Sequence, residues 1–483
     1  MSYEREREPA NLDPDPQRSS VPDVVLVVLD TARADFVGVA HDTAFAQLGR
    51  AGRRFHRAIA PAPWTLPSHA SIFSGLRPSE HGITGAAVLT DSGPRAPRAL
   101  VEELGDRWLP EAMRRSGYAT FAASGNPWIG TSTGLTYGFD SVFEAWRSAG
   151  LPKLADPLRA FVGRGRISRI ARASLVHARR VAGAGDGGAA RSLDAFEDFL
   201  DGREPGAPYF AFFNVIEPHA PYTPPIRHDP TTLRARPSAL RAVRRWNAER
   251  MIRFNLGRED IDPHELGLLR ELYRGEIAYA DAWLTRLLEL LRARRSLDET
   301  LLIVTADHGE NLGEHHLMSH VMSMHETLLH VPLAMAGPGV PGGEETAPVS
   351  LTALRPLMLA SGDWRDPVAL PVVAEYESAS SQVTHAGGLE DRVGDVPKEV
   401  LRRLRARWIA KYEGPFKYAA SSAGEERLAD LQADPSEEND VSTDHHEVVR
   451  RLREAPAAVR PAADGTDPLE AEIAAHLEGL GYL

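Results

Sequence analysis

The sequence predicts an α/β fold: a large, mostly parallel sheet flanked by helices, followed by a smaller C-terminal α+β subdomain. Short runs of apolar and β-branched residues recur along the chain, which is typical of strands buried on both faces. Amphipathic helical patterns lie between these runs, and such alternation favours a parallel sheet. The alternation stops at the turn-rich stretch AGPGVPGGEE, residues 336–345.

Each predicted element follows from its local pattern. The predicted strands cover residues 24–29, 118–123, 209–215, 301–306 and 331–336. The predicted helices cover residues 98–116, 193–201, 239–252 and 264–294. Apolar residues recur through the last of these at the i, i+3, i+4 spacing of one helix face. Beyond residue 345, the stretch RWIAKYEGPFKYAAS predicts a hairpin.

Length and composition restrict the function classes. The chain has 483 residues, 43% of them hydrophobic and 25% charged, as in a soluble enzyme. We expect a disordered tail over 1–20, a catalytic domain over 21–345 and a C-terminal subdomain over 346–483. The net charge of −12 argues against a nucleic-acid binder. Zero cysteines exclude a thiolate nucleophile. No apolar run suits a signal peptide or membrane anchor, so we expect a cytoplasmic protein.

Polar residues that could carry chemistry follow the predicted strands. Asp30 ends the first strand, and Asp307 and His308 directly follow residues 301–306. His219 lies in the proline-rich loop after residues 209–215. Ligands of open α/β sheets bind outside the carboxyl ends of the strands. An adjacent carboxylate and imidazole suit a metal site, although Asp30 alone could be an ordinary helix cap.

A second candidate is the stretch WTLPSHASIF, which predicts a helix start. Thr65 or Ser68 could cap this helix and do nothing more. A helix N-terminus also binds anions, because its N–H groups are free. A hydroxyl there beside a divalent cation could ionise and attack phosphorus or sulfur.

Together these stretches resemble the sulfatase branch of the alkaline phosphatase superfamily over residues 22–340. The motifs are PDVVLVVLDTARAD, WTLPSHASIFSGLRPSEHG, FFNVIEPHAPY and TADHGENLGEHHLMSH. The resemblance implies a metal site, a nucleophile, two histidines that protonate the leaving group or line the pocket, and further substrate contacts. The residues implied for the metal are Asp30, Thr65, Asp307 and His308, and the implied nucleophile is Thr65. The implied histidines are His219 and His320, and the implied substrate contacts are Ser68, His69 and Asn126.

The chain departs from the usual sulfatase pattern at its nucleophile and its metal ligands. Sulfatases oxidise a Cys or Ser to formylglycine, but the matching residue here is Thr65. Oxidation of a Thr side chain would give a ketone, so we expect direct attack by the hydroxyl, as in related phosphodiesterases. The pairs Asp30-Thr31 and Asp307-His308 lose one carboxylate and gain an imidazole relative to the usual pattern, which favours Mn²⁺ or Zn²⁺, with Ca²⁺ still possible, for the one expected metal ion.

The sequence therefore predicts a metal-dependent hydrolase that cleaves a sulfate or phosphate ester, with a tilt towards phosphodiesters. Its partner would be a small anionic ester. One alternative is a two-metal phosphodiesterase or pyrophosphatase whose second site uses Glu217, His219 and His320. Others are a phospho-group transferase and an inactive binding protein on the same fold. The sequence predicts no oligomeric state.

Overall fold

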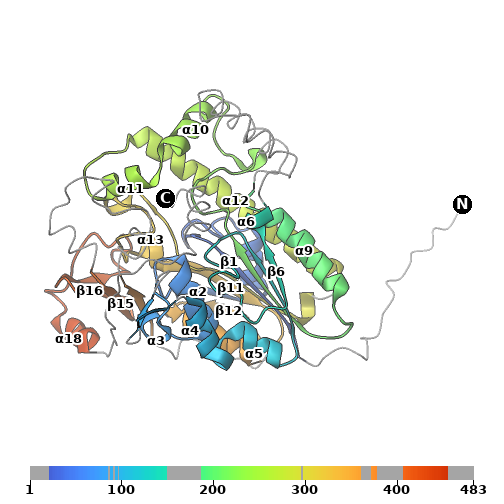
Figure 1. The fold of residues 1–483 in the computed structure, drawn as a ribbon. Coiled ribbons are helices and arrows are strands. Elements are labelled where there is room, and N and C mark those ends of the chain that lie inside the picture. The colour runs from blue at the N-terminus through green and yellow to red at the C-terminus, as the bar shows by residue number, and fades with distance from the viewer. Residues whose placement is uncertain are drawn as a thin grey trace, which may run out of the picture.

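The computed structural model describes residues 21–84, 88–90, 93–95, 97–148, 186–294, 297–360, 371–377 and 406–454. Figure 1 shows a central sheet between two groups of helices, with a second sheet at one side. The predicted disordered tail, residues 1–20, lies outside the described residues.

The central sheet contains nine strands of the described chain, and its main path runs β12-β2-β11-β8-β1-β7-β5-β6. These strands are β12 (Gly343–Glu345), β2 (Arg53–Ile59), β11 (His330–Ala336), β8 (Thr300–Ala306), β1 (Asp23–Leu29), β7 (Tyr209–Val215), β5 (Ala119–Ser124) and β6 (Ser141–Glu144), with β13 (Val349–Ser350) paired to β2. All five predicted strands are confirmed. Two small two-stranded sheets pair β3 (Val88–Thr90) with β4 (Gly93–Arg95) and β9 (Asn311–Leu312) with β10 (Met318–Ser319).

The strand directions decide which side chains meet. β8, β1, β7, β5 and β6 are mutually parallel, so their carboxyl ends lie at one edge of the sheet. β11 runs antiparallel to both β8 and β2. β2 therefore points the same way as β8, and the chain leaving β2 arrives at the same edge.

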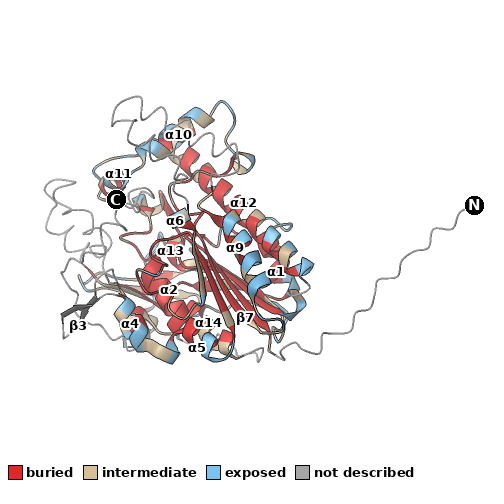
Figure 2. Cartoon of the chain, turned by 45° about the vertical axis from the view of Figure 1, so that its right-hand side comes forward, coloured by how far each residue is buried: buried red, intermediate tan, exposed pale blue. Residues whose placement is uncertain are grey.

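Helices cover both faces of the sheet, as the sequence predicts (Figure 2). Neighbouring β7 side chains point to opposite faces. The Phe212 ring centroid lies 4.9 Å from that of Phe73 in α2 (Thr65–Ser74), and the Phe213 ring centroid lies 5.3 Å from that of Trp283 in α12 (Pro263–Ala293). All seven residues of β7 and all ten of α2 are buried. The sheet is thus enclosed on both faces, which explains its uninterrupted apolar sequence.

The described α-helices are α1 (Ala44–Ala51), α2 (Thr65–Ser74), α3 (Pro78–His81), α4 (Pro97–Leu104), α5 (Leu109–Arg115), α6 (Ala145–Ser148), α9 (Ala189–Gly202), α10 (Arg236–Arg245), α11 (Ala248–Asn255), α12 (Pro263–Ala293), α13 (Glu326–Leu329), α14 (Leu354–Leu359) and α18 (His446–Glu454). Short 3-10 helices are η1 (Gly105–Arg107), η3 (Ile226–His228), η4 (Leu297–Glu299), η5 (Glu314–His316) and η6 (Leu351–Ala353). Within this part of the chain, no helix is both long and apolar enough to cross a bilayer.

Two predicted helices are each divided in the structure. The stretch 98–116 forms α4, η1 and α5, because Gly105 has a φ of 51° and ends the α-helical path. The stretch 239–252 forms α10 and α11, since Asn247 is extended and its side chain caps α11 by accepting from the Arg250 N–H. Helical periodicity continues across both breaks, so the sequence pattern hid them.

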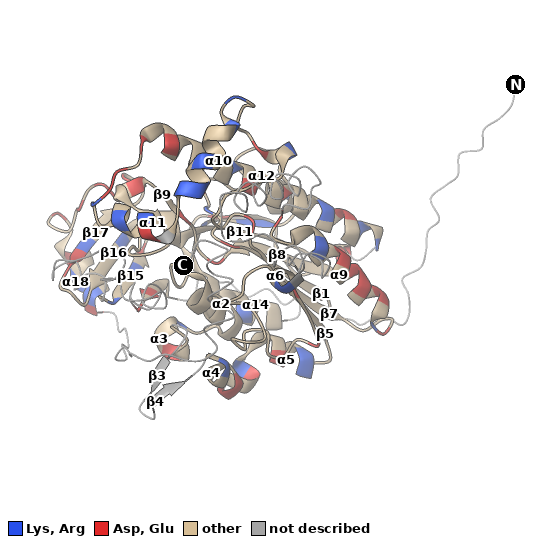
Figure 3. Ribbon diagram, turned by 45° about the horizontal axis from the view of Figure 1, so that its top comes forward, with Lys and Arg blue, Asp and Glu red and all other residues tan. Residues whose placement is uncertain are grey.

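The C-terminal part contains the predicted hairpin within a four-stranded antiparallel sheet. Its strands are β14 (Val373–Tyr376), β15 (Trp408–Glu413), β16 (Phe416–Ser421) and β17 (Glu426–Asp430). A separate apolar cluster joins this sheet to α18 through Tyr418, Leu428, Val449 and Leu452. β13 pairs with β2 beyond residue 345, so the central sheet continues past the predicted boundary. Figure 3 shows charged residues mainly on the surrounding helices and loops, whereas the central strands carry few.

Candidate active site

Polar side chains from four neighbouring parallel strands meet at the carboxyl edge of the sheet. Asp30 follows β1, Asp307 follows β8, Asn126 follows β5, and Asn214 is the penultimate residue of β7. Asp30 Oδ2 accepts from Asn126 Nδ2 at 2.8 Å and from Asn214 Nδ2 at 3.1 Å. These two amides fix the Asp30 carboxylate, and Asn214 is a site residue that the sequence analysis missed.

Thr65 comes to the same edge as the first residue of α2, after β2. Trp64 occupies the capping position, and no side chain caps this helix. The interpretation of Thr65 or Ser68 as an ordinary helix cap is therefore wrong. The Ser68 hydroxyl instead donates to the Asp307 carbonyl at 2.6 Å. Thr65 Oγ1 lies 3.3 Å from His308 Nε2 and 3.5 Å from Asn126 Nδ2. The Thr65 hydroxyl thus faces the polar cluster.

Three ligand atoms converge beside this hydroxyl. His308 Nδ1 donates to the Gly309 carbonyl at 2.9 Å, so Nε2 carries the lone pair. Nε2 lies 3.3 Å from Asp307 Oδ2 and 4.0 Å from Asp30 Oδ1. Both carboxylate oxygens are buried and accept no hydrogen bond from the described residues. Three lone-pair atoms within 4.8 Å of one another therefore face a common point.

The electrostatics of this cluster fit a divalent cation. Asp30, Asp307 and His308 are all fully buried. Burial, and then the neighbouring Asp30 carboxylate, raise the pKa of Asp307 well above its ordinary value. Burial lowers the pKa of His308 well below its ordinary value. Buried carboxylates require a positive partner or a proton. Two carboxylate oxygens and one imidazole nitrogen are ligands that divalent metal ions take in proteins.

His69 lies beneath the cluster, on the side of the core. Its Nδ1 donates to the Thr65 carbonyl at 2.9 Å and lies 3.4 Å from Asp307 Oδ2. Its ring centroid lies 5.9 Å from that of Phe212. Burial lowers the pKa of His69 to about 4, so the imidazole is neutral at neutral pH. His69 and Ser68 both contact Asp307, and their predicted contact with substrate stays a prediction.

His219 and His320 extend the cluster beyond His308. The His320 ring centroid lies 4.6 Å from that of His308 and 5.2 Å from that of His219. His320 Nδ1 lies 3.3 Å from Oε1 of Glu310, a fully buried residue. The sequence analysis missed Glu310, although it stands only three residues after Asp307. The structure thus brings both predicted histidines beside His308.

Other polar residues of the same motifs lie elsewhere. Glu217 Oε1 accepts from the Ala189 N–H at 3.0 Å, and no ligand cluster of the described chain joins Glu217 to His219 and His320. His316 stacks on Phe254 with ring centroids 4.0 Å apart. Residues of one sequence motif therefore do not all belong to one site.

Comparison with known proteins agrees with this geometry. The family model described as Sulfatase matches residues 22–360. The chain belongs to the sulfatase family. Members of this family are ester hydrolases, and the predicted family and fold class are both confirmed.

Individual relatives are more distant. The chain is 30% identical over 178 residues to a choline-sulfatase from Rhizobium meliloti, and the match covers 37% of this chain and 34% of that protein. It is 28% identical over 207 residues to arylsulfatase K from Mus musculus, covering 39% and 35%. The matched region thus spans about a third of these relatives. A phosphonate monoester hydrolase of Agrobacterium radiobacter shares the fold, with a TM-score of 0.61, 19% identity, and coverage of 90% and 94%.

Proposed function

We propose that this chain hydrolyses a monoanionic phosphate or sulfate ester with a threonine nucleophile and one divalent metal ion. The observation that carries the proposal is the placement of the Thr65 hydroxyl. It lies 3.3 Å from His308 Nε2, the same atom that lies 3.3 Å from Asp307 Oδ2. A hydroxyl, an imidazole and unsatisfied carboxylates in one buried site support nucleophilic catalysis rather than binding alone.

Asp30, Asp307 and His308 would hold the metal ion, with Thr65 beside it. When bound, such an ion lowers the pKa of a neighbouring hydroxyl and stabilises negative charge on the substrate. Asn126 and Asn214 keep the Asp30 carboxylate in place, and the Thr31 N–H holds the Asp307 carboxylate at 3.2 Å. These outer contacts orient the ligands before substrate arrives.

The reaction follows from the positions of the side chains. Thr65 Oγ1 would give its proton to the neutral imidazole of His219 or His320, attack phosphorus or sulfur and form the new ester bond to Thr65. The bond to the leaving oxygen would break, and that oxygen would take the same proton back from the imidazole. Water then attacks the same phosphorus or sulfur and restores the Thr65 hydroxyl. The Thr65 and Leu66 N–H groups at the start of α2 would support the negative charge during both steps, whereas Pro67 has no N–H and the Ser68 N–H donates to the Trp64 carbonyl at 3.3 Å.

Charge balance favours a monoanionic ester. A divalent ion and the two carboxylates of Asp30 and Asp307 sum to zero, and Glu310 beside His320 adds no positive charge. Burial lowers the pKa values of His69, His219 and His308, so these imidazoles add no positive charge at neutral pH. No Lys or Arg forms an ion pair with Asp30 or Asp307 among the described residues. A phosphate monoester, which carries close to two charges, would therefore bind less well than a phosphodiester or a sulfate ester.

The identity of the nucleophile favours a phosphodiester over a sulfate ester as the substrate. A Thr side chain cannot become the formylglycine aldehyde on which the usual sulfatase reaction depends. The shared fold with a phosphonate monoester hydrolase is compatible with chemistry at phosphorus. The matches to choline-sulfatase and arylsulfatase K keep sulfate esters within the proposal.

A direct comparison of substrates tests the proposal. The assay measures hydrolysis of p-nitrophenyl sulfate, p-nitrophenyl phosphate and bis-p-nitrophenyl phosphate with Mn²⁺, Zn²⁺ or Ca²⁺. We expect the diester with Mn²⁺ or Zn²⁺ to react fastest. Thr65→Ala should abolish turnover, whereas Thr65→Ser, which keeps the hydroxyl, should retain part of it. Activity on the sulfate alone with Ca²⁺ would overturn the tilt towards phosphorus. No turnover by the wild type would favour a binding protein.

A further inference from the structure

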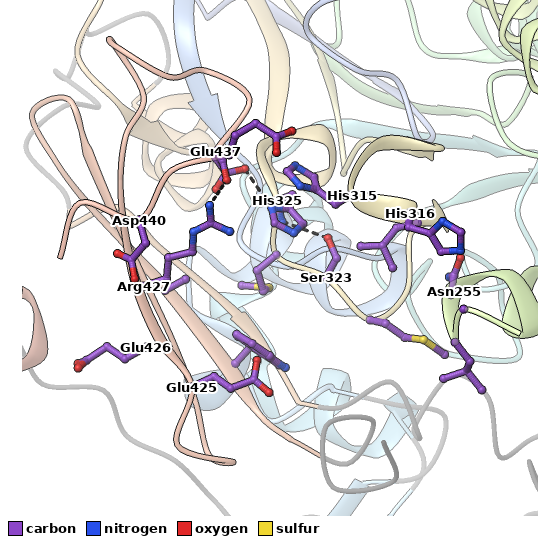
Figure 4. Close-up of a pocket in the computed structure, with 18 residues that line it drawn as sticks. Asn255, His315, His316, Ser323, His325, Glu425, Glu426, Arg427, Glu437 and Asp440 are labelled. Atoms are coloured by element: carbon purple, nitrogen blue, oxygen red, sulfur yellow. Dashed lines mark hydrogen bonds and ion pairs between the residues drawn. The ribbon is translucent and has the colours of Figure 1, made fainter. Parts of the chain in front are cut away.

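A second group of ligand-type side chains lies outside the catalytic cluster. His315 belongs to η5, His325 directly precedes α13, and Glu437 follows β17. One ligand atom from each of these residues lies within 4.8 Å of the other two. Figure 4 shows the three side chains together in the wall of a cavity of about 790 Å³. The group shares no residue with the catalytic cluster.

We propose that His315, His325 and Glu437 bind a zinc-type divalent ion that ties the loop carrying His320 to the C-terminal segment. Two imidazole nitrogens and one carboxylate oxygen form a donor set that zinc prefers, whereas Ca²⁺ and Mg²⁺ prefer oxygen alone. All three residues line the cavity, which leaves a further coordination position open to water.

The carboxylate of this site is held firmly before any ion binds. Glu437 Oε2 accepts from the Glu326 N–H at 2.6 Å and lies 3.4 Å from His325 Nδ1. Glu437 Oε1 lies 2.8 Å from Lys417 Nζ, which also contacts the Glu326 carboxylate at 3.0 Å. One positive and two negative charges leave these three groups at −1. Arg427, which contacts the Glu437 carbonyl, adds a second positive charge to the cavity wall. Glu438 and Asp440 add two carboxylates, so the surroundings do not become positive.

The backbone at two of the ligands is unusual. His315 has a φ of 52° and Glu437 has a φ of 56°. This left-handed region is unfavourable for residues with a side chain. His316, which is not part of the group, has a φ of 57° as well, so this backbone conformation directs the side chains without marking the ligands.

The two imidazoles are adjacent but stacked. Their ring centroids lie 3.8 Å apart, and their planes differ by 10°. A metal ion lies close to the plane of each ring that binds it, so one ring has to turn about its Cβ–Cγ bond. The cavity beside the rings gives room for that rotation.

Metal counting on the folded full-length protein tests this site. The protein is stripped with a chelating resin, reloaded with Zn²⁺ or with Co²⁺, and analysed for bound metal per chain. We expect His325→Ala and His315→Asn to lose one equivalent of metal relative to the wild type. Asn is chosen at position 315 because it tolerates positive φ. The visible absorption of bound Co²⁺ should fall with the loss.

His316→Asn is the matched control, because His316 lines the same cavity and has a φ of 57°, close to that of His315, but stacks on Phe254. This variant should bind as much metal as the wild type. Zn²⁺ should also raise the melting temperature of the wild type more than that of His325→Ala. Equal metal content in the wild type, His325→Ala and His315→Asn overturns the proposal, and so does a wild type that binds no metal. Loss of hydrolytic activity alone would not produce either result.

Discussion

The buried Glu217 carboxyl group provides a sharp test of the electrostatics beside the active site. Burial, and then the nearby Asp186 carboxylate, raise the pKa of Glu217 from 4.5 to about 8. The folded protein therefore keeps a proton that the unfolded chain releases once the pH exceeds 4.5. Because the unfolded state binds fewer protons, stability falls as the pH rises from about 4.5 to about 8. The Glu217→Gln variant has no carboxyl group at this position, so its stability should not fall in this way.

The size of the effect follows from the two pKa values. One pKa unit corresponds to about 1.4 kcal/mol, so the shift from 4.5 to about 8 gives at most about 5 kcal/mol. The Gln oxygen can still accept from the Ala189 N–H, which bonds Glu217 Oε1 at 3.0 Å. We expect the variant to gain stability over the wild type between pH 5 and pH 8.5, by up to this amount.

Urea unfolding followed by tryptophan fluorescence measures this difference at both pH values. Glu289→Gln is the control, because Glu289 is exposed and its substitution should give the same small difference at each pH. A stability difference for Glu217→Gln that does not change between pH 5 and pH 8.5 would refute the reasoning. Loss of bound metal in Glu217→Gln would instead show that Glu217 is a metal ligand, as the two-metal alternative requires.

Three further substitutions test the contacts around the site. Asn126→Ala removes one of the two amides that hold Asp30, and we expect Mn²⁺ affinity, measured by titration, to fall about 10- to 100-fold; unchanged affinity would contradict this role. A Cβ at Gly309 would lie 2.1 Å from the Thr327 carbonyl oxygen. Gly309→Ala should therefore displace the adjacent metal ligand and lower turnover while circular dichroism stays native; normal turnover would show that the loop adapts. Lys417→Met leaves the buried Glu437 carboxylate and the partly buried Glu326 carboxylate without their cation, and urea unfolding should show a loss of about 3 kcal/mol, whereas a loss under 1 kcal/mol would contradict the ion network.

The sequence by itself determined the fold class and much of the catalytic cluster. A strand buried on both faces has to be apolar along its length, so all five predicted strands could be found from short apolar runs in the sequence. Parallel strands end at one edge, so Asp30, Asp307 and His308 could be expected together before their distances were known. The absence of cysteine and the presence of Thr65 already predicted a departure from the usual sulfatase chemistry.

Tertiary structure decided which of the remaining polar residues belong to the site. β2 was missed because its sequence RRFHRAI is half polar, yet its direction brings Thr65 to the active edge. Asn214 contacts Asp30, which is distant in the chain. Glu310 contacts His320 because the loop between them brings the two side chains together.

His315 and His325 show the same limit at the second cluster. They stand on one loop, but Glu437, which lies more than a hundred residues later, completes the group. Local sequence patterns predict strands and helices, because the hydrophobic spacing of each element repeats over a few residues. A site depends on where those elements end in space, and only the folded chain fixes that.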